Sequence, residues 1–299
     1  MKKKAFIYMI VAGMLWGTSG IFVRYLTPLG FTSWQMTAAR GTVSFIATAI
    51  LALFTNRQAF KAKPSHFLIF AVMGLCHFLT AGCYYTSMQL TNIPTAVILM
   101  YTAPIYVTIL SAIFLKEKIT SPKAIAIMVM LVGCALVSGV TRGLSFNILG
   151  VLMGLSSGLA YATYNVLVKV YINKGVSSAS ISLYSFMFMS IIALIFASPV
   201  DFAQTIAKEP IRSLPLLIGL GIVTFVIPYS LFNLSLEHLS AGTVSALGVI
   251  EPMSATIYSI VFLDGIPDVA SIVGIILVLF AVVMEGIIEN KHQNDKITE

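Results

Sequence analysis

The segment at residues 240–263, SAGTVSALGVIEPMSATIYSIVFL, decides the class of fold. At about 1.5 Å per residue, a helix of this length crosses the hydrocarbon core of a bilayer, which is about 30 Å thick. The one formal charge, Glu251, lies near its middle, and Pro252 follows directly, where a helix loses a backbone hydrogen bond. A carboxylate and a helix break at this depth are costly unless they meet water or polar partners. The sequence therefore predicts that the rest of the chain gives Glu251 a hydrated or paired environment.

The composition of the whole chain is that of an integral membrane protein. Hydrophobic residues make up 58% of it and charged residues 10%, whereas a soluble domain carries about 25% charged residues. The formal net charge is +7, but the basic residues lie in short loops between apolar runs, which indicates membrane topology and not a nucleic-acid partner. Three cysteines lie inside apolar runs without the spacing of a zinc site, and we interpret them as buried structural residues: Cys76, Cys83 and Cys134.

Ten apolar segments follow one another with only short connections between them. We expect every one to be a helix, because strands of a membrane β-barrel would show as alternating segments of about ten residues. The N-terminus resembles a signal peptide, but its apolar run is too long and no clear cleavage site follows, so we interpret it as the first span. The segments lie at 5–26, 31–54, 66–89, 92–114, 120–140, 147–170, 177–198, 213–236, 240–263 and 267–288.

Lysine and arginine residues are distributed unevenly between the two sets of loops. With the N-terminus in the cytoplasm, the inner set holds 13 of them and the outer set holds 4. Because basic residues are enriched on the cytoplasmic side, the sequence predicts a multi-pass protein of a bacterial-type plasma membrane with both termini in the cytoplasm. The inner set is Lys2, Lys3, Lys4, Arg57, Lys61, Lys63, Lys116, Lys118, Lys123, Lys169, Lys174, Lys291 and Lys296, and the outer set is Arg24, Arg142, Lys208 and Arg212.

The two halves of the chain repeat each other at offsets of 145 and 148 residues. Each half holds five predicted spans, and because five is odd the second half enters the membrane from the opposite side. In such an inverted repeat one central site can face either side of the membrane. A chance match between two halves rich in Leu, Ile and Val is the alternative, although aromatic, basic and proline positions also match. The matched pairs are Gly13 with Gly158, Trp16 with Tyr161, Thr18 with Thr163, Arg24 with Lys169, Thr95 with Thr243, Leu99 with Leu247, Pro104 with Pro252 and Leu115 with Leu263.

We therefore predict an all-α integral membrane fold of ten transmembrane helices in two inverted-topology five-helix repeats. The first repeat occupies residues 1–140 and the second occupies residues 147–288, with a linker at 141–146. Residues 289–299 form a polar cytoplasmic tail.

Four motifs carry a resemblance to a known family. They are GMLWGTSGIFVRYL at 13–26, AAR at 38–40, TAPIYVTILSAIFLKE at 102–117 and IEPMSATIYSIVFL at 250–263. In this order, and with ten spans in the chain, they resemble the EamA type of the drug/metabolite transporter superfamily. The resemblance implies a basket of ten helices around a central cavity and secondary transport of small metabolites, among which amino acids are frequent. Members usually carry an acidic residue after the apolar run in both halves; Glu117 fits, whereas the second half has Gly265 with Asp264 beside it.

Two charged residues inside predicted spans are the first candidates for a binding site. Glu251 has no basic residue three or four positions away, so an ionic partner must come from another helix. We interpret it as a site for a substrate ammonium group or a proton, since an intramembrane acid can hold a proton when dry and release it when hydrated. A buried glutamate bonded to a backbone carbonyl is the alternative. Arg40 lies about 13 Å into its span by helical rise, and it either ties two helices together or contacts substrate.

His77 lies near the middle of the third segment, beside Cys76. The residues four positions away, Met73 and Ala81, are not convincing metal ligands, so we predict no metal site. A hydrogen-bonded packing histidine is one interpretation, and a proton relay that includes Glu251 is the other.

Aromatic and amide side chains recur near the centres of the predicted spans. Rings around a carboxylate suit an organic ammonium or an aromatic solute, and amides are costly where they face lipid. Ordinary packing is the alternative for each of them. From this set we predict a binding role, together with Glu251 and Arg40, for Trp16, Tyr84, Tyr101, Tyr161, Asn165 and Asn233.

The sequence has no Walker loop and no HExxH or G-x-S-x-G motif, so we predict that the protein is not an enzyme and needs no cofactor. Our first hypothesis is a secondary transporter that moves a small polar or amphipathic metabolite, such as an amino acid or an amine, by alternating access. Export is favoured over uptake, and coupling to protons is left open. The alternatives are a passive facilitator or channel and a non-transporting membrane scaffold. The expected partners are the lipid bilayer and a small-molecule substrate. No nucleic-acid partner is expected, and the oligomeric state is left open, with a monomer compatible with the sequence.

Overall fold

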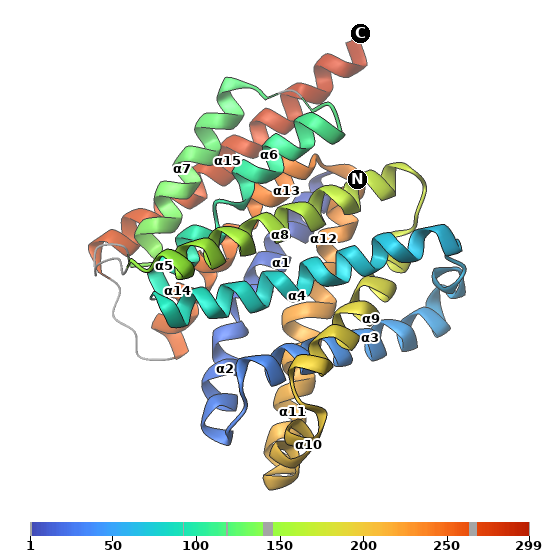
Figure 1. Cartoon of the computed structure of the whole chain (residues 1–299). Coiled ribbons are helices and arrows are strands. Elements are labelled where there is room, and N and C mark those ends of the chain that lie inside the picture. The colour runs from blue at the N-terminus through green and yellow to red at the C-terminus, as the bar shows by residue number, and fades with distance from the viewer. Residues whose placement is uncertain (1, 92, 118, 140–145, 263–267, 299) are drawn as a thin grey trace.

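The computed structural model describes residues 2–91, 93–117, 119–139, 146–262 and 268–298, and all regular elements in these ranges are helices (Figure 1). The all-α prediction is therefore confirmed for this part of the chain. The main helices of the first half are α1 (Lys2–Gly17), α2 (Ser19–Leu26), α3 (Ser33–Thr55), α4 (Phe67–Leu90), α5 (Ile93–Met100), α6 (Ala103–Phe114) and α7 (Ser121–Val137). Those of the second half are α8 (Ile148–Asn173), α9 (Ser178–Phe196), α10 (Pro199–Lys208), α11 (Pro210–Gly221), α12 (Ile227–His238), α13 (Ala241–Leu247), α14 (Ile250–Phe262) and α15 (Val269–Thr298).

Seven helical segments of the described chain are long and apolar enough to cross a membrane, and Ser121–Val137 and Val269–Glu285 are shorter apolar helices. This set does not establish the predicted count of ten spans, because the predicted span 240–263 contains two short helices, α13 and α14. The predicted tail continues helix α15 as far as Thr298. Several predicted features lie outside the described residues: most of the linker, Lys118, Arg142, Asp264 and Gly265.

Three of the predicted spans are interrupted within the bundle. Thr18 separates α1 from α2, Tyr101 and Thr102 separate α5 from α6, and Gly248 and Val249 separate α13 from α14. A fourth interruption is the π-helix Ile222–Val226 between α11 and α12.

The break in the span that holds Glu251 was expected at Pro252, and this expectation was wrong. Pro252 is the third residue of α14, where the backbone N–H groups have no partner within the helix, so a missing N–H costs little. The chain leaves the helical path one turn earlier, at Gly248 and Val249. Glu251 consequently lies in the first turn of a helix and not in the middle of one.

The equivalent helices α1 and α8 run in opposite directions. At the carboxyl end of α12, the Ser235 hydroxyl donates to the carbonyl of Ala5 at the start of α1 (2.9 Å). At the same end of α12, Lys169 near the end of α8 donates to the carbonyls of Leu236 and Leu239. The start of α1 and the end of α8 therefore lie together, so these two equivalent helices are antiparallel.

Contacts of the two halves match in the way that the sequence offsets predict. A Cβ atom added to Gly13 would lie 2.9 Å from Ile250, and one added to Gly158 would lie 3.3 Å from the Thr102 hydroxyl. Ile250 and Thr102 are themselves 148 residues apart. α3 packs along α9, its counterpart in the other half, and α7 packs along α15.

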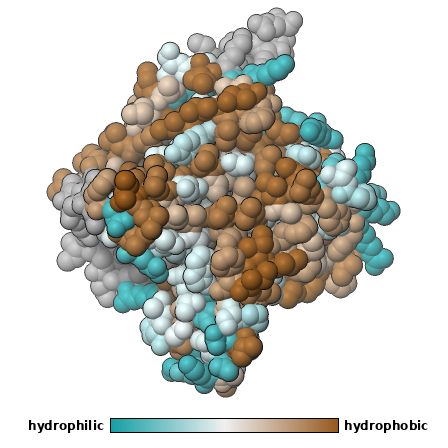
Figure 2. All heavy atoms as spheres, viewed as in Figure 1, coloured by the Kyte–Doolittle hydropathy of each residue, from teal (hydrophilic) through white to brown (hydrophobic). Residues whose placement is uncertain are grey.

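The outer surface of the bundle is largely apolar. In Figure 2 hydrophobic residues cover most of the visible face, and hydrophilic ones gather at its margins. Phe54 is 85% exposed and Leu68 is 78% exposed. Such exposure of large apolar side chains is expected where lipid tails replace water as the solvent.

Candidate functional site

A cavity of about 580 Å³ lies between the interrupted helices. Its walls come from both halves of the chain: α1 and α2, α3, α4, α5 and α6, and α7 from the first, and α8, α12, α13 and α14 from the second. The structure brings together on this cavity seven residues predicted from the sequence to act in binding or proton transfer. They are Trp16, Arg40, His77, Tyr84, Tyr101, Tyr161 and Glu251.

Glu251 projects from the first turn of α14 and is half-buried. Its backbone N–H donates to the carbonyl of Gly248 (3.0 Å), which fixes the break that precedes it. The hydroxyl of Tyr101 lies next to its carboxylate, without the geometry of a hydrogen bond. In the described part of the chain Glu251 has no ion pair and no hydrogen bond to a backbone carbonyl, which disfavours the purely structural interpretation of this residue.

The approach of α1 to this turn depends on a glycine. A Cβ atom added to Gly17 would lie 2.8 Å from the backbone nitrogen of Ala255 and 3.0 Å from the carbonyl oxygen of Glu251. No larger residue fits there unless one of the helices moves. Gly17 therefore seats α1 on the helix that carries Glu251.

Arg40 both ties two elements together and reaches the cavity, so the two interpretations made from the sequence are not exclusive. Its guanidinium carbon lies 5.0 Å from the centre of the Phe225 ring, and Nη2 donates to the carbonyl of Thr224 (3.4 Å). No ion pair joins Arg40 to Glu251 among the residues described. The cavity thus holds one guanidinium and one carboxyl group that do not neutralise each other by direct contact.

His77 is buried among aromatic rings and not in a polar network. Its ring centre lies 4.0 Å from that of Tyr164 and 4.5 Å from that of Tyr229. Its Nε2 atom has no hydrogen-bond partner, so the hydrogen-bonded packing role is not observed at this atom. The described residues contain no group of His, Cys, Asp and Glu side chains that could hold a metal ion.

Buried polar atoms without a partner cluster around this cavity. In native proteins most buried polar atoms have a hydrogen-bond partner, and exceptions call for a bound water, a ligand or a functional role. Six cavity-lining residues of the described chain have such an atom: Trp16 (Nε1), Arg40 (Nε), His77 (Nε2), Tyr101 (Oη), Tyr161 (Oη) and Ser245 (Oγ).

The two predicted asparagines are not among the residues that line the cavity. The Asn165 side chain donates to the carbonyl of Ala241 (3.4 Å). Asn233 accepts from the Tyr164 hydroxyl (3.3 Å) and donates to the Ser182 hydroxyl (2.8 Å). Both amides are fully buried and bond to other helices. The Asn233 amide has a partner for its oxygen and for its nitrogen, whereas Oδ1 of Asn165 has no hydrogen-bond partner among the described residues.

The sequence did not single out several polar residues that do line the cavity, among them Arg24, Ser138 and Ser245. Arg24 was assigned only to the outer set of basic residues. Its match with Lys169 in the other half was the signal that could have drawn attention to it. Serine hydroxyls inside apolar runs give no comparable signal, because most of them bond within their own helix.

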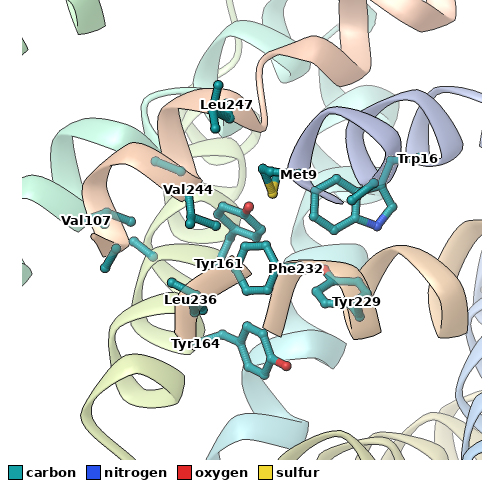
Figure 3. Close-up of a cluster of buried hydrophobic side chains, with 14 of the residues drawn as sticks. Met9, Trp16, Val107, Tyr161, Tyr164, Tyr229, Phe232, Leu236, Val244 and Leu247 are labelled. Carbon is teal, nitrogen blue, oxygen red and sulfur yellow. The ribbon is translucent and has the colours of Figure 1, made fainter. Parts of the chain in front are cut away.

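One end of the cavity is open and the other is closed. The open end, beside α2, reaches the surface at Gly20 and Arg24, which are both exposed. At the closed end, beside the start of α1, a buried apolar cluster surrounds Tyr161 and reaches Trp16 (Figure 3). Its labelled members that are wholly buried are Met9, Val107, Phe232, Leu236, Val244 and Leu247.

Polar contacts also hold the closed end together. A carboxylate oxygen of Glu117 accepts from the backbone N–H of Ala241 at the start of α13 (3.3 Å). Lys123 lies 3.6 Å from the other oxygen of Glu117 and donates to the Ser240 hydroxyl (3.4 Å). These contacts join α7 and the segment after α6 to α13, so they cross between the two halves.

Residues 3–139 and 148–285 each match the model of the EamA-like transporter family. An uncharacterized transporter of Archaeoglobus fulgidus is 25% identical over 92% of this chain and 93% of its own length. The pseudopaline exporter CntI of Pseudomonas aeruginosa is 23% identical over 80% of this chain and 81% of its own length. A crystal structure of another protein superposes with a TM-score of 0.78 at 15% identity, over 97% of this chain and 99% of that one, which shows a shared fold.

Proposed function

Because this chain belongs to the EamA-like transporter family, we propose that it is a secondary transporter that moves a small solute carrying a cationic group by alternating access. The single observation that carries the proposal is the cavity. Glu251 lines it, and so do buried polar atoms that have no hydrogen-bond partner among the described residues. A closed apolar end below the cavity favours a carrier over a passive channel. The large apolar outer surface suits a protein embedded in a bilayer, across which the solute is moved.

The charges in the cavity define the solute that fits best. Glu251 suits an ammonium group, and the rings of Trp16, Tyr101 and Tyr161 offer electron-rich faces to the same cation. Arg40, from the other half, suits a carboxylate. An amino acid presents both groups and an amine presents only the first. A zwitterion should therefore bind more tightly than the amine of the same size.

The antiparallel relation of the equivalent helices α1 and α8 supports alternating access. Rocking one inverted repeat against the other closes one end and opens the other around a fixed site. With both termini in the cytoplasm, as the basic residues predict, the open end of this structure faces outward. Export is the direction that we propose, and one of the similar proteins is an exporter. A site that is dry in one state and hydrated in the other would let Glu251 exchange a proton for the solute.

Binding to the purified protein tests the proposal. Three ligands that share one aromatic side chain serve as probes: an aromatic amino acid, its decarboxylated amine, and its N-acetyl derivative, which lacks the cation. We expect the melting temperature to rise most with the amino acid, less with the amine and not at all with the N-acetyl acid. Stabilisation by the N-acetyl acid alone would contradict the role given to Glu251.

A further inference from the structure

The two ends of the cavity differ at one pair of equivalent basic residues, Arg24 and Lys169. The segments around them match position by position, with Trp16 equivalent to Tyr161 and Gly20 equivalent to Asn165. The rings of Trp16 and Tyr161 meet with their centres 6.5 Å apart. The two segments thus start from a common point at the centre of the molecule and run to opposite ends.

At the closed end Lys169 makes hydrogen bonds to the backbone of another helix. Its ammonium group donates to the carbonyl of Leu236 and to that of Leu239 (2.9 Å), at the carboxyl end of α12. The carbonyl groups in the last turn of a helix have no partner within the helix and attract cations. Four residues earlier on the same helix, Asn165 bonds to the carbonyl of Ala241. Lys169 therefore holds α8 to α12, and Asn165 holds it to α13.

At the open end Arg24 has no such contact. It is exposed, and in the described part of the chain it makes no hydrogen bond or ion pair. A Cβ atom added to Gly20, the equivalent of Asn165, would have no atom within 4 Å. The element equivalent to the carboxyl end of α12 is the carboxyl end of α4, where Met88 stands 148 residues before Leu236. Met88 and Arg24 both line the cavity at this end.

An interruption of the helix makes this segment a short helix of its own. Thr18 interrupts the helix between α1 and α2, and its hydroxyl donates to the carbonyl of Leu15 (2.7 Å). α8 has no such interruption over its range Ile148–Asn173. Beyond the break α2 packs mainly on α11 (Figure 1), and the ring of Phe22 fills the space above Gly219.

We propose that α2 is the gate of the open end and that Arg24 locks it shut. When the cavity opens at the other end, α2 turns about Thr18 towards α4. Arg24 then donates to carbonyl groups in the last turn of α4, Met88 among them, while Lys169 releases α12. In each state one of the two equivalent basic residues thus holds the end of a helix. This inference rests on the alternating access proposed above, but it concerns the gate and is independent of which solute is carried.

Thiol labelling of the open end tests the gate without any substrate. In a variant with Cys76, Cys83 and Cys134 replaced by alanine, Gly20→Cys places a thiol in the open mouth. The rate at which a bulky maleimide labels the purified protein in detergent then follows the population of the open-mouthed state. Size-exclusion profile and melting temperature are measured for every variant, and Lys169→Arg keeps the donors as a conservative control.

Lys169→Gln should release the closed end and slow the labelling of position 20 by about tenfold, a population change that corresponds to about 1.4 kcal/mol. Adding Arg24→Gln should restore most of the rate, because the shut mouth then loses its lock. Arg212→Gln is the matched control, since Arg212 is an exposed arginine of α11 paired only with Glu209 among the described residues, and it should restore nothing.

Restoration by Arg212→Gln to the same extent as by Arg24→Gln would overturn the role of Arg24 as the lock. An unchanged labelling rate in Lys169→Gln would overturn the paired roles of Lys169 and Arg24. Neither result bears on solute binding, which the melting experiment measures separately. If the melting experiment contradicts the proposed solute but the labelling rates change as expected, the gate is still supported and only the identity of the transported solute has to be revised.

Discussion

We propose that binding in the cavity depends on the carboxyl group of Glu251. It lines the cavity with no ion pair inside the described chain, so a ligand cation or a proton is its available partner. Glu251→Gln keeps the size and the hydrogen-bonding capacity but fixes the neutral form. We expect transport to fall by more than about tenfold, equivalent to about 1.4 kcal/mol, with the pH dependence of the remaining activity lost.

Glu237→Gln provides the control for this variant. Glu237 is exposed on α12 and accepts a hydrogen bond from Ser178 (2.6 Å). Its removal should leave uptake and its pH profile unchanged. Radiolabelled solute flux in proteoliposomes on either side of neutral pH gives the comparison, and a Glu251→Gln protein that transports like the parent at every pH would make Glu251 a structural residue.

Arg40 should determine how much more tightly the cavity binds a zwitterion than an amine. Its guanidinium lies over Phe225 and shares the cavity with Glu251. Arg40→Gln should weaken binding of the amino acid by about tenfold or more, since hydrogen bonds to charged groups contribute about 1.5–3 kcal/mol. Binding of the decarboxylated amine should change little, which isothermal titration can show. An equal loss for both ligands would mean that Arg40 acts by holding α3 to Thr224 and not by contacting the carboxylate.

Among the elements, the contact of α1 with the first turn of α14 offers the sharpest test of packing. Gly17→Ala would place a methyl group 2.8 Å from a backbone nitrogen of Ala255, an overpacking that typically costs about 1–3 kcal/mol. Gly20→Ala, three residues later, meets no atom within 4 Å and is the matched control. We expect a lowered melting temperature for the first variant only. Equal melting temperatures would show that α1 does not seat on α14 in this way.

How far the sequence predicts these elements depends on where the polar groups find partners. Intramembrane charges cannot face lipid, so Glu251 and Arg40 could be expected to point inward from the sequence alone. Asn165 and Asn233 obey the same rule, but their partners lie on helices 76 and 69 residues away. No local sequence pattern distinguishes an amide that bonds to another helix from one that binds a ligand. The break at Gly248 was missed for a related reason: proline is tolerated in a first turn, and only packing fixes where that turn begins.

For the molecule as a whole, the orientation in the membrane is predicted only from the distribution of lysine and arginine residues between the two sets of loops. Single cysteines at Lys61 and Lys174 should be protected from an impermeant thiol reagent in intact cells. Those at Lys208 and Arg212 should react, because the basic residues of the inner set mark the cytoplasmic side. Cells opened by detergent supply the control, in which all four positions label. Labelling of position 61 or 174 from outside would reverse the orientation and with it the side on which the present cavity opens.

The repeat is the feature of the whole chain that the sequence predicts best. Offsets of 145 and 148 residues follow from matches such as Trp16 with Tyr161, and these two rings meet in the structure. The difference between the open and closed ends could not be predicted, because both halves of a repeat carry similar residues. The closed end is held by contacts such as that of Lys169 with Leu239, which we propose to be absent when the other end closes.

Counterflow tests the central claim, that one cavity serves both sides of the membrane in turn. Proteoliposomes loaded with unlabelled amino acid are diluted into a trace of the radiolabelled one. A carrier with alternating access should accumulate label transiently above equilibrium, and Glu251→Gln should abolish this overshoot while Glu237→Gln retains it. Label that only equilibrates, at a rate independent of the unlabelled solute inside, would indicate a passive pore and would contradict alternating access.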